Sequence, residues 1–130
     1  VWPVPSFGHL RSFVIEADSH TRLNPEEPVV PYVSDCFGDQ TPTVAASDYI
    51  ASVPEMIQRW VGGRFVVLGT DGFGRSDSRE ALRAFFEIDT SSIVVASLSA
   101  LEQEGKIPPG SVQKAMSQIG ISPDRADKTV

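Results

Sequence analysis

Residues 66–82 read VVLGTDGFGRSDSREAL, and the rest of the chain is best read outward from this stretch. The apolar, β-branched run over residues 65–68 predicts a short buried strand. Three glycines and two aspartates then break the pattern, which is typical of a loop with unusual backbone angles. A helix should follow, with Asp77 as its N-cap and Glu80 three residues on, close to a capping box. The unit is therefore a strand, a glycine-rich loop and a helix, and α/β sheets place their binding sites at the carboxyl ends of such strands.

The glycine-rich loop does not have the chemistry of the two well-known phosphate-binding loops. A dinucleotide fingerprint needs a glycine where Asp77 stands, and a negative charge there would face the pyrophosphate. A P-loop needs a lysine followed by serine or threonine, and residues 66–82 contain no lysine. We therefore exclude a nucleotide cradle built by this loop alone.

The pattern extends past the helix, through Phe86-Glu87-Ile88-Asp89 to Ile93-Val94-Val95-Ala96. Residues 68–96 as a whole resemble the last domain of the homodimeric pyruvate dehydrogenases, the thiamine diphosphate-dependent first component of the pyruvate dehydrogenase complex. A looser version of the pattern occurs in the carboxyl-terminal domain of transketolases. Further matches lie at Trp2, Ser6-Phe7, Leu23-Asn24-Pro25, Val30-Pro31-Tyr32-Val33 and Val44-Ala45-Ala46-Ser47-Asp48-Tyr49. The resemblance thus covers nearly the whole chain.

The resemblance implies a division of labour within a larger enzyme. That enzyme decarboxylates pyruvate and transfers the acetyl unit to a lipoyl group. Thiamine diphosphate and Mg²⁺ are held by two preceding domains that meet across a homodimer, so no catalytic, cofactor-binding or metal residue is expected here. This domain supplies dimer and interdomain contacts. The implied partners are the rest of the enzyme, a second subunit and the lipoyl acyltransferase component, and the 130-residue piece alone is expected to be inactive.

Composition places the chain among ordinary globular proteins, with 41% hydrophobic and 22% charged residues. Its 130 residues predict one domain, residues 1–130. The net charge of −6 argues against nucleic acid and an anionic membrane as partners. No apolar run approaches the roughly 20 residues of a membrane span, and the amino terminus has no signal-peptide pattern. The single cysteine, Cys36, fits a reducing cytoplasm.

Helices and strands alternate along the chain. The predicted strands cover residues 43–47 and 65–68. Two helices are predicted before the second strand, one capped by Ser6 and one from Asp48 to Trp60 that is interrupted at Pro54. Three helices are predicted after it: one following Asp77, one from Asp89 or Thr90 to about Glu104, and a short one around 112–119 that ends at Gly120. This order favours an α/β fold, a three-layer α/β/α sandwich with a mostly parallel sheet. Two or three strands are too few for such a sheet, and the resemblance implies that the domain's first strand and helix are missing.

Three further segments carry specific expectations. Residues 24–42 contain four prolines and predict a long ordered loop or an extended crossing segment. The helix ending near Glu104 is apolar around most of its circumference and should be largely buried. The polar tail over residues 123–130 should be frayed.

The candidate site residues are Asp71, Phe73, Arg75, Asp77 and Arg79. The two aspartates could be paired carboxylates, but we favour a turn-stabilising role for Asp71 and a helix cap for Asp77. The arginines could receive a phosphate or carboxylate, although pairing with those aspartates or with a neighbouring subunit is the preferred interpretation. For Phe73, between two glycines, we favour filling an apolar pocket over stacking on a ligand, and the preferred interpretation places that pocket in another domain or subunit. The loop is therefore predicted to be an interface element.

Two alternative functions stay open. A non-catalytic regulatory or scaffold module of the same fold is favoured by Pro3, Pro5 and the divergent segment 16–21. Another thiamine enzyme, such as a transketolase, fits less well because residues 72–77 match the dehydrogenase version better. His9 and His20 are the only histidines, and neither has metal-ligand spacing to other donors.

Overall fold

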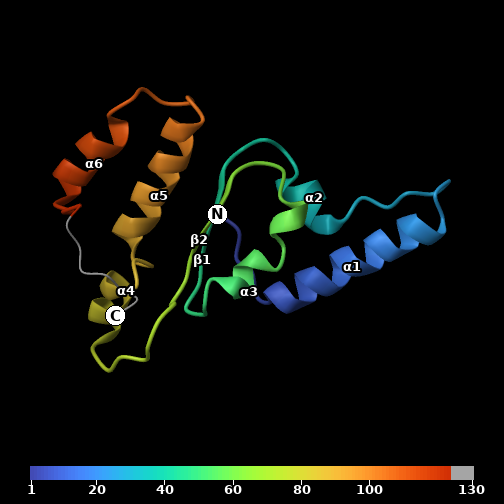
Figure 1. The fold of residues 1–130 in the computed structure, drawn as a ribbon, viewed down its shortest axis with the longest axis horizontal. Helices are drawn as coiled ribbons and strands as arrows, with labels where there is room; N and C mark the ends of the chain where they lie inside the picture. The colour runs from blue at the N-terminus through green and yellow to red at the C-terminus, as the bar shows by residue number, and fades with distance from the viewer. Residues whose placement is uncertain (124–130) are drawn as a thin grey trace. The chain divides into compact units, whose positions relative to one another are not determined.

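The computed structural model describes residues 1–123, and these residues form two compact units. The first unit comprises residues 1–43 and 52–65, and the second comprises residues 44–51 together with the chain from residue 66 onward. Figure 1 shows the order of the elements along the chain. Of the tail predicted to be frayed, residues 124–130 lie outside the described residues.

The first unit is built around α1 (Phe7–Leu23). Ser6 caps this helix as predicted, because its hydroxyl accepts a hydrogen bond from the His9 backbone N–H at 3.2 Å. One face of α1 buries Val14 completely. Around it lie α2 (Tyr32–Phe37), α3 (Ser52–Glu55) and the 3₁₀-helix η1 (Gln58–Trp60).

A cluster of buried apolar side chains holds the first unit together. Its members are Val14, Val33, Ile57 and Val61, with Phe7, Leu10, Phe37, Trp60 and Phe65 packed around them. Two long-range hydrogen bonds add to this packing. The indole Nε1 of Trp60 donates to the Asp18 carboxylate at 3.1 Å, and the Ser34 hydroxyl donates to the Trp60 carbonyl at 3.0 Å.

Helix α2 corrects the prediction that residues 24–42 are loop throughout. Three of the four prolines precede the helix and the fourth follows it. Pro31 occupies the N-cap position in an extended conformation, and its carbonyl accepts from Asp35 N–H at 3.0 Å. The prolines therefore lie on either side of a helix and do not prevent one from forming.

The helix expected from Asp48 to Trp60 is also different in the structure. Asp48 caps no helix, and regular structure is limited to the four residues of α3 and the three of η1. The Ser47 hydroxyl accepts from the Tyr49 N–H at 3.1 Å, so the chain turns where the helix should begin. Pro54, expected to interrupt the helix, lies inside α3.

The sheet has two strands within the described residues, β1 (Thr43–Ala46) and β2 (Phe65–Leu68). Thr43 N–H donates to the Arg64 carbonyl and Ser47 N–H donates to the Leu68 carbonyl. Both bonds join residues of the same sequence separation, so the strands run parallel. The predicted α/β class with parallel pairing is confirmed.

The second unit contains α4 (Arg79–Phe85), α5 (Thr90–Gln103) and α6 (Ser111–Ile119). Of the two predicted caps of α5, Asp89 is the one found, and its carboxylate accepts from Ser92 N–H at 2.9 Å. Helix α6 ends at Gly120, whose φ of 79° is the left-handed conformation that glycine tolerates. Helices α5 and α6 pack against each other.

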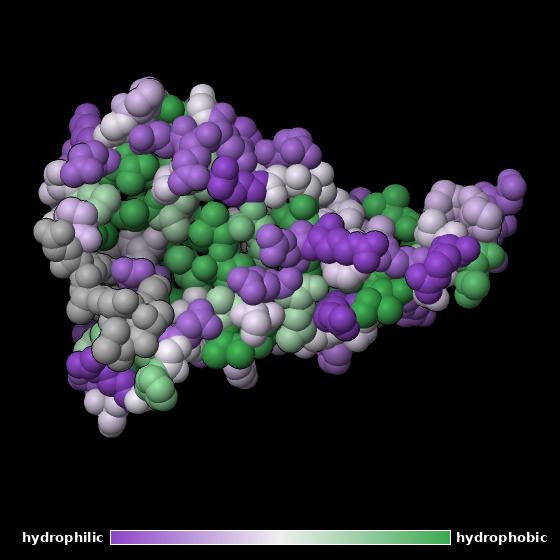
Figure 2. All heavy atoms as spheres, viewed as in Figure 1, coloured by the Kyte–Doolittle hydropathy of each residue, from purple (hydrophilic) through white to green (hydrophobic). Residues whose placement is uncertain are grey.

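Helix α5 is less buried than its composition predicts. Only Ser92 and Ala100 are buried in it, and Val94 is 39% exposed. The prediction of a largely buried helix is therefore wrong for this chain, because α6 covers only part of its apolar circumference. Figure 2 shows hydrophobic residues reaching the surface between polar ones on the face in view.

Residues 79–103 are long and apolar enough to cross a membrane by length and composition alone. The chain leaves the helical conformation inside this stretch, between the end of α4 at Phe85 and the Asp89 cap of α5. Glu87 there has a φ of 57°. Core helices of soluble proteins pass the same test, so the finding is weak evidence for a membrane segment.

Glu102 links the end of α5 to the start of α6. Its carboxylate accepts from Val112 N–H at 2.9 Å and from Gly110 N–H at 3.0 Å. These hydrogen bonds hold the pKa of Glu102 below its ordinary value, and the bond from Val112 N–H makes the largest contribution. An acidic side chain from one helix therefore caps the next.

Candidate interface loop and adjoining cavity

The base of the loop over residues 71–77 is tied to the segment that follows β1. Asp71 accepts a hydrogen bond from Ala51 N–H at 3.2 Å. The Thr70 hydroxyl donates to the Asp48 carbonyl at 3.0 Å, and Thr70 N–H donates to the Tyr49 carbonyl at 2.9 Å. These three bonds fix the start of the loop, all within the second unit.

The two aspartates of the loop do separate structural jobs. We expected Asp71 to stabilise its own turn, but its carboxylate binds a backbone amide twenty residues earlier in the chain. Asp77 accepts from Ser78 N–H at 2.7 Å. Each carboxylate is thus engaged by a backbone N–H, which favours the structural interpretation over paired acid–base groups.

The cap of α4 lies one residue later than predicted. The Ser78 hydroxyl accepts from Ala81 N–H at 3.3 Å, which makes Ser78 the N-cap in place of Asp77. The helix therefore starts at Arg79, and Glu80 falls one position short of the place that a capping box requires.

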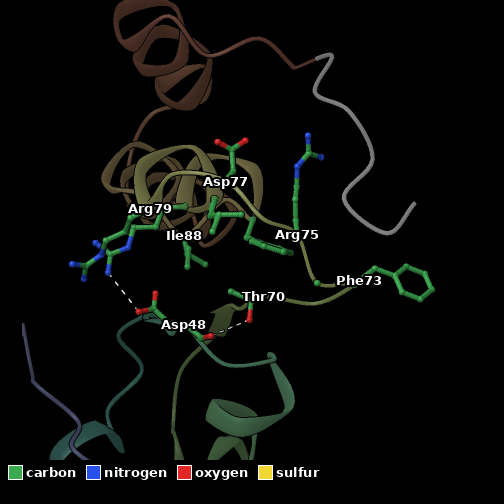
Figure 3. Close-up of a pocket in the computed structure, with 12 residues that line it drawn as sticks. Asp48, Thr70, Phe73, Arg75, Asp77, Arg79 and Ile88 are labelled. Carbon is green, nitrogen blue, oxygen red and sulfur yellow. Dashed lines mark hydrogen bonds and ion pairs between the residues drawn. The ribbon is translucent and has the colours of Figure 1, made fainter.

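Phe73 is presented at the tip of the loop. Its side chain is 83% exposed, and in Figure 3 it points away from the other labelled residues. Gly72 has a φ of 107°, and a Cβ on Gly74 would meet nothing within 4 Å. Glycines on both sides therefore allow the ring to project into solvent. Its predicted role as a plug for an apolar pocket elsewhere stays a prediction.

The arginines have partners that sequence reasoning did not anticipate. The guanidinium carbon of Arg75 lies 4.5 Å from the centre of the Phe85 ring, a cation–π contact. Arg83 lies 3.6 Å from the Asp48 carboxylate. Arg83 and Asp48 were missing from the candidate set, although the spacing of Arg79 and Arg83 by four residues signals a shared helix face.

The loop, α4 and the segment that follows β1 line an open cavity of about 490 Å³ in the second unit. Figure 3 shows Ile88 pointing between Thr70 and α4, with Asp48 below. The lining residues are Asp48, Thr70, Gly72, Phe73, Gly74, Arg75, Asp77, Arg79, Leu82, Arg83, Phe86 and Ile88. Four of the five predicted site residues line this cavity, and Asp71 does not.

The donor set of the cavity does not suit Mg²⁺, which prefers several oxygen ligands. Three guanidinium groups face two carboxylates there, and both carboxylates are already engaged, Asp48 by Arg83 and Asp77 by Ser78 N–H. Within residues 1–123, no group of three histidine, cysteine or acidic side chains is placed to hold a metal ion. We therefore derive no chemical step through a metal or cofactor from these residues.

Comparison with known proteins gives one family and a consistent set of relatives. Residues 1–89 match the family described as "Transketolase-like TK C-terminal domain". The chain is 44% identical over 128 residues to the pyruvate dehydrogenase E1 component of Pseudomonas aeruginosa, covering 96% of this chain and 14% of that protein. It is 41% identical over 123 residues to that of Mycolicibacterium smegmatis, covering 93% of this chain and 13% of that protein. It is 40% identical over 129 residues to that of Escherichia coli K12, covering 98% of this chain and 14% of that protein.

These alignments extend beyond the family match. Coverage of 96% of the chain leaves too few residues out to omit either α5 or α6, so the similarity reaches both helices although the family match ends at residue 89. The chain spans about 14% of the length of these relatives. The similarity therefore concerns one small region of a much longer type of protein.

Proposed function

The chain belongs to the family of transketolase-like TK C-terminal domains, and on this premise we propose that it is the carboxyl-terminal domain of a pyruvate dehydrogenase. The observation that supports the proposal most strongly is the 44% identity to a pyruvate dehydrogenase E1 component over 96% of the chain. The complete enzyme decarboxylates pyruvate and transfers the acetyl unit to a lipoyl group. Thiamine diphosphate, with its Mg²⁺, supplies the carbanion-stabilising chemistry when bound.

In this proposal the cofactor is bound by other domains, and this domain supplies contacts. The donor chemistry of the cavity fits that division for the metal ion alone, since Mg²⁺ prefers several oxygen ligands and the cavity is lined by three arginines and two engaged aspartates. The partners are the rest of the enzyme, a second subunit in a homodimer, and the lipoyl acyltransferase component of the complex. The proposed location is the cytoplasm, as the single cysteine suggests.

Phe73 and Arg75 are the proposed contact residues of the loop. Aromatic residues, including phenylalanine, and arginine are enriched at protein interfaces, and this loop carries one of each. Phe73 is 83% exposed on a loop whose base is fixed by hydrogen bonds from Thr70 and to Asp71. A fixed base reduces the ordering cost of binding, which suits a docking element.

A segment exchange tests the proposal. The matching 128-residue segment of the Pseudomonas aeruginosa relative is replaced by this chain, and pyruvate decarboxylation is measured with thiamine diphosphate and Mg²⁺. We expect the exchanged protein to keep the oligomeric state of the relative and most of its activity. The same relative without the segment is the negative control and should lose both.

Two outcomes contradict the proposal. Measurable decarboxylation by the isolated 130-residue chain would show that the catalytic groups are not elsewhere. An exchanged protein in which this segment is folded but the native oligomer does not form would favour the alternative, a regulatory or scaffold module of the same fold. Light scattering after size-exclusion chromatography distinguishes these cases.

A further inference from the structure

The cavity beside the loop has the opposite charge to the chain as a whole. The chain has a net charge of −6, whereas the cavity is lined by Arg75, Arg79 and Arg83 against two aspartates. An excess of guanidinium groups in one hollow attracts anions. The sign of the cavity therefore points to an anionic ligand.

The two carboxylates only partly neutralise the three guanidinium groups, which leaves one excess positive charge in the lining. Asp77 is hydrogen-bonded to Ser78 N–H, and Figure 3 shows it on the far side of the cavity from Asp48. Asp48 approaches Arg83 only to 3.6 Å, with side-chain exposures of 41% for Arg83 and 68% for Asp48. An ion pair this long and this exposed is weak and exchanges readily with another anion.

Arg79 and Arg83 form a natural pair of donors. They are four residues apart on α4, which places both on one face of the helix, where like charges repel each other. Among residues 1–123 the structure records an acidic partner for Arg83 but not for Arg79. A bound carboxylate or phosphate would accept hydrogen bonds from both guanidinium groups and remove the repulsion.

The floor of the cavity is apolar. Phe86 and Ile88 are 7% and 9% exposed, and Leu82 lies beside them. The volume of about 490 Å³ lies within the usual range for small-molecule sites. An apolar floor under a cationic rim suits a ligand with a charged end and an apolar body.

We propose that this cavity binds a small organic anion, with its carboxylate or phosphate group held by Arg79 and Arg83 and its apolar body against Phe86 and Ile88. The site depends only on the second unit and does not require the assignment to pyruvate dehydrogenase. A neighbouring hollow shares Asp48 and Arg83 with this cavity but is also lined by Glu80 and Asp89. Its lining therefore has a net negative charge, which does not suit an anionic ligand.

The test is a calorimetric titration of the chain with phenyl phosphate and with phenylacetate, at low salt. Benzyl alcohol is the neutral comparison, and inorganic phosphate tests the need for an apolar body. We expect saturable binding of both organic anions that weakens as salt is added, and weaker binding of the other two probes. The relative affinity of the two organic anions identifies whether the site prefers a ligand with a phosphate group or one with a carboxylate group.

Four variants assign the binding to this cavity. Arg79→Gln and Arg83→Gln should each raise the Kd about tenfold or more, since each removes a charge-assisted hydrogen bond. Asp48→Asn should lower the Kd by roughly two- to fivefold, because Arg83 loses its competing carboxylate. Arg11→Gln, an exposed change of the same charge on α1, should leave the Kd unchanged.

The proposal is wrong if no organic anion binds saturably up to ~10 mM, a weak limit for a specific site. It is equally wrong if benzyl alcohol binds as well as the anions, or if Arg79→Gln and Arg11→Gln behave alike. Circular dichroism of each variant shows whether it is folded. If Arg79→Gln is not folded, Arg79→Lys takes its place. Lysine keeps the positive charge but lacks the planar guanidinium group, so this variant should weaken binding by a smaller factor.

Discussion

The two units of the chain use their apolar residues differently. In the first, Val14, Val33 and Ile57 are at most 2% exposed and belong to one connected cluster. In the second, Phe86 and Ile88 are nearly as buried, yet they form the floor of an open cavity, and Phe73 is 83% exposed. Both units expose large apolar side chains, such as Leu23 at 74% and Val30 at 69% in the first unit. The difference therefore lies in the buried residues, which form a connected cluster in the first unit and line an open cavity in the second.

The largest expected effect is the loss of a core side chain in the first unit. Replacing Ile57 with alanine should lower the free energy of unfolding by about 2–5 kcal/mol, because it removes buried methylene groups and leaves a cavity. Both tryptophans, Trp2 and Trp60, lie in this unit, so their fluorescence during urea unfolding reports the loss directly.

The matched control is Ile15→Ala, on α1 in the same unit. Ile15 is 42% exposed, so this variant should lower the free energy of unfolding much less than the core substitution does. Equal losses for the two variants would mean that the buried cluster does not hold this unit together.

Local signals predicted most helix and strand positions. The caps at Ser6 and Asp89, the strand over 65–68 and the end of the last helix at Gly120 are all found in the structure. Each of these depends on a few neighbouring residues. Helix α2 was missed because proline content was read as evidence for a loop, although the prolines only bound the helix.

The failed helix after Asp48 has a different cause. The periodic spacing of apolar residues in that segment is genuine, but Thr70 and Asp71 hold its first part by hydrogen bonds from a distant stretch of chain. Such long-range bonds have no signature in a single sequence. For the same reason the pairing of Arg83 with Asp48 could not be predicted from the sequence.

The cap of α4 gives the next largest effect and lies in the second unit. Ser78→Ala should destabilise the helix by about 1 kcal/mol, because the Ala81 N–H loses its acceptor. Amide hydrogen exchange at Ala81 and Leu82 measures the change. Asp77→Ala should have the smaller effect at these amides, and the reverse order would restore Asp77 as the cap.

The capping of α6 by Glu102 predicts a pH dependence. Hydrogen bonds from Val112 and Gly110 lower the pKa of Glu102 in the folded chain, so its ionised form stabilises the fold above the ordinary pKa of a glutamic acid. This contribution should be lost as the pH falls through the lower folded-state pKa. Glu102→Gln should remove that part of the acid dependence, as measured by hydrogen exchange at Val112 between about pH 3 and 6.

Glu16→Gln is the control for the loss of one carboxylate. Glu16 is exposed on α1, in the first unit, so its replacement should leave the acid dependence at Val112 unchanged. If both variants change that profile equally, the effect comes from net charge and not from the cap.

The smallest effect on stability, and the most informative for function, is expected at the loop tip. Phe73→Ala should change the free energy of unfolding by less than about 0.5 kcal/mol, since the ring is 83% exposed. In the segment exchange with the Pseudomonas aeruginosa relative, the same substitution should weaken assembly by about tenfold or more if the ring is an interface anchor. Sedimentation of the exchanged protein over a range of concentrations measures this, with the equally apolar but half-exposed Ile50→Ala as control. If Phe73→Ala changes neither stability nor assembly, Phe73 is not an interface anchor. The cavity is then the functional feature of the second unit.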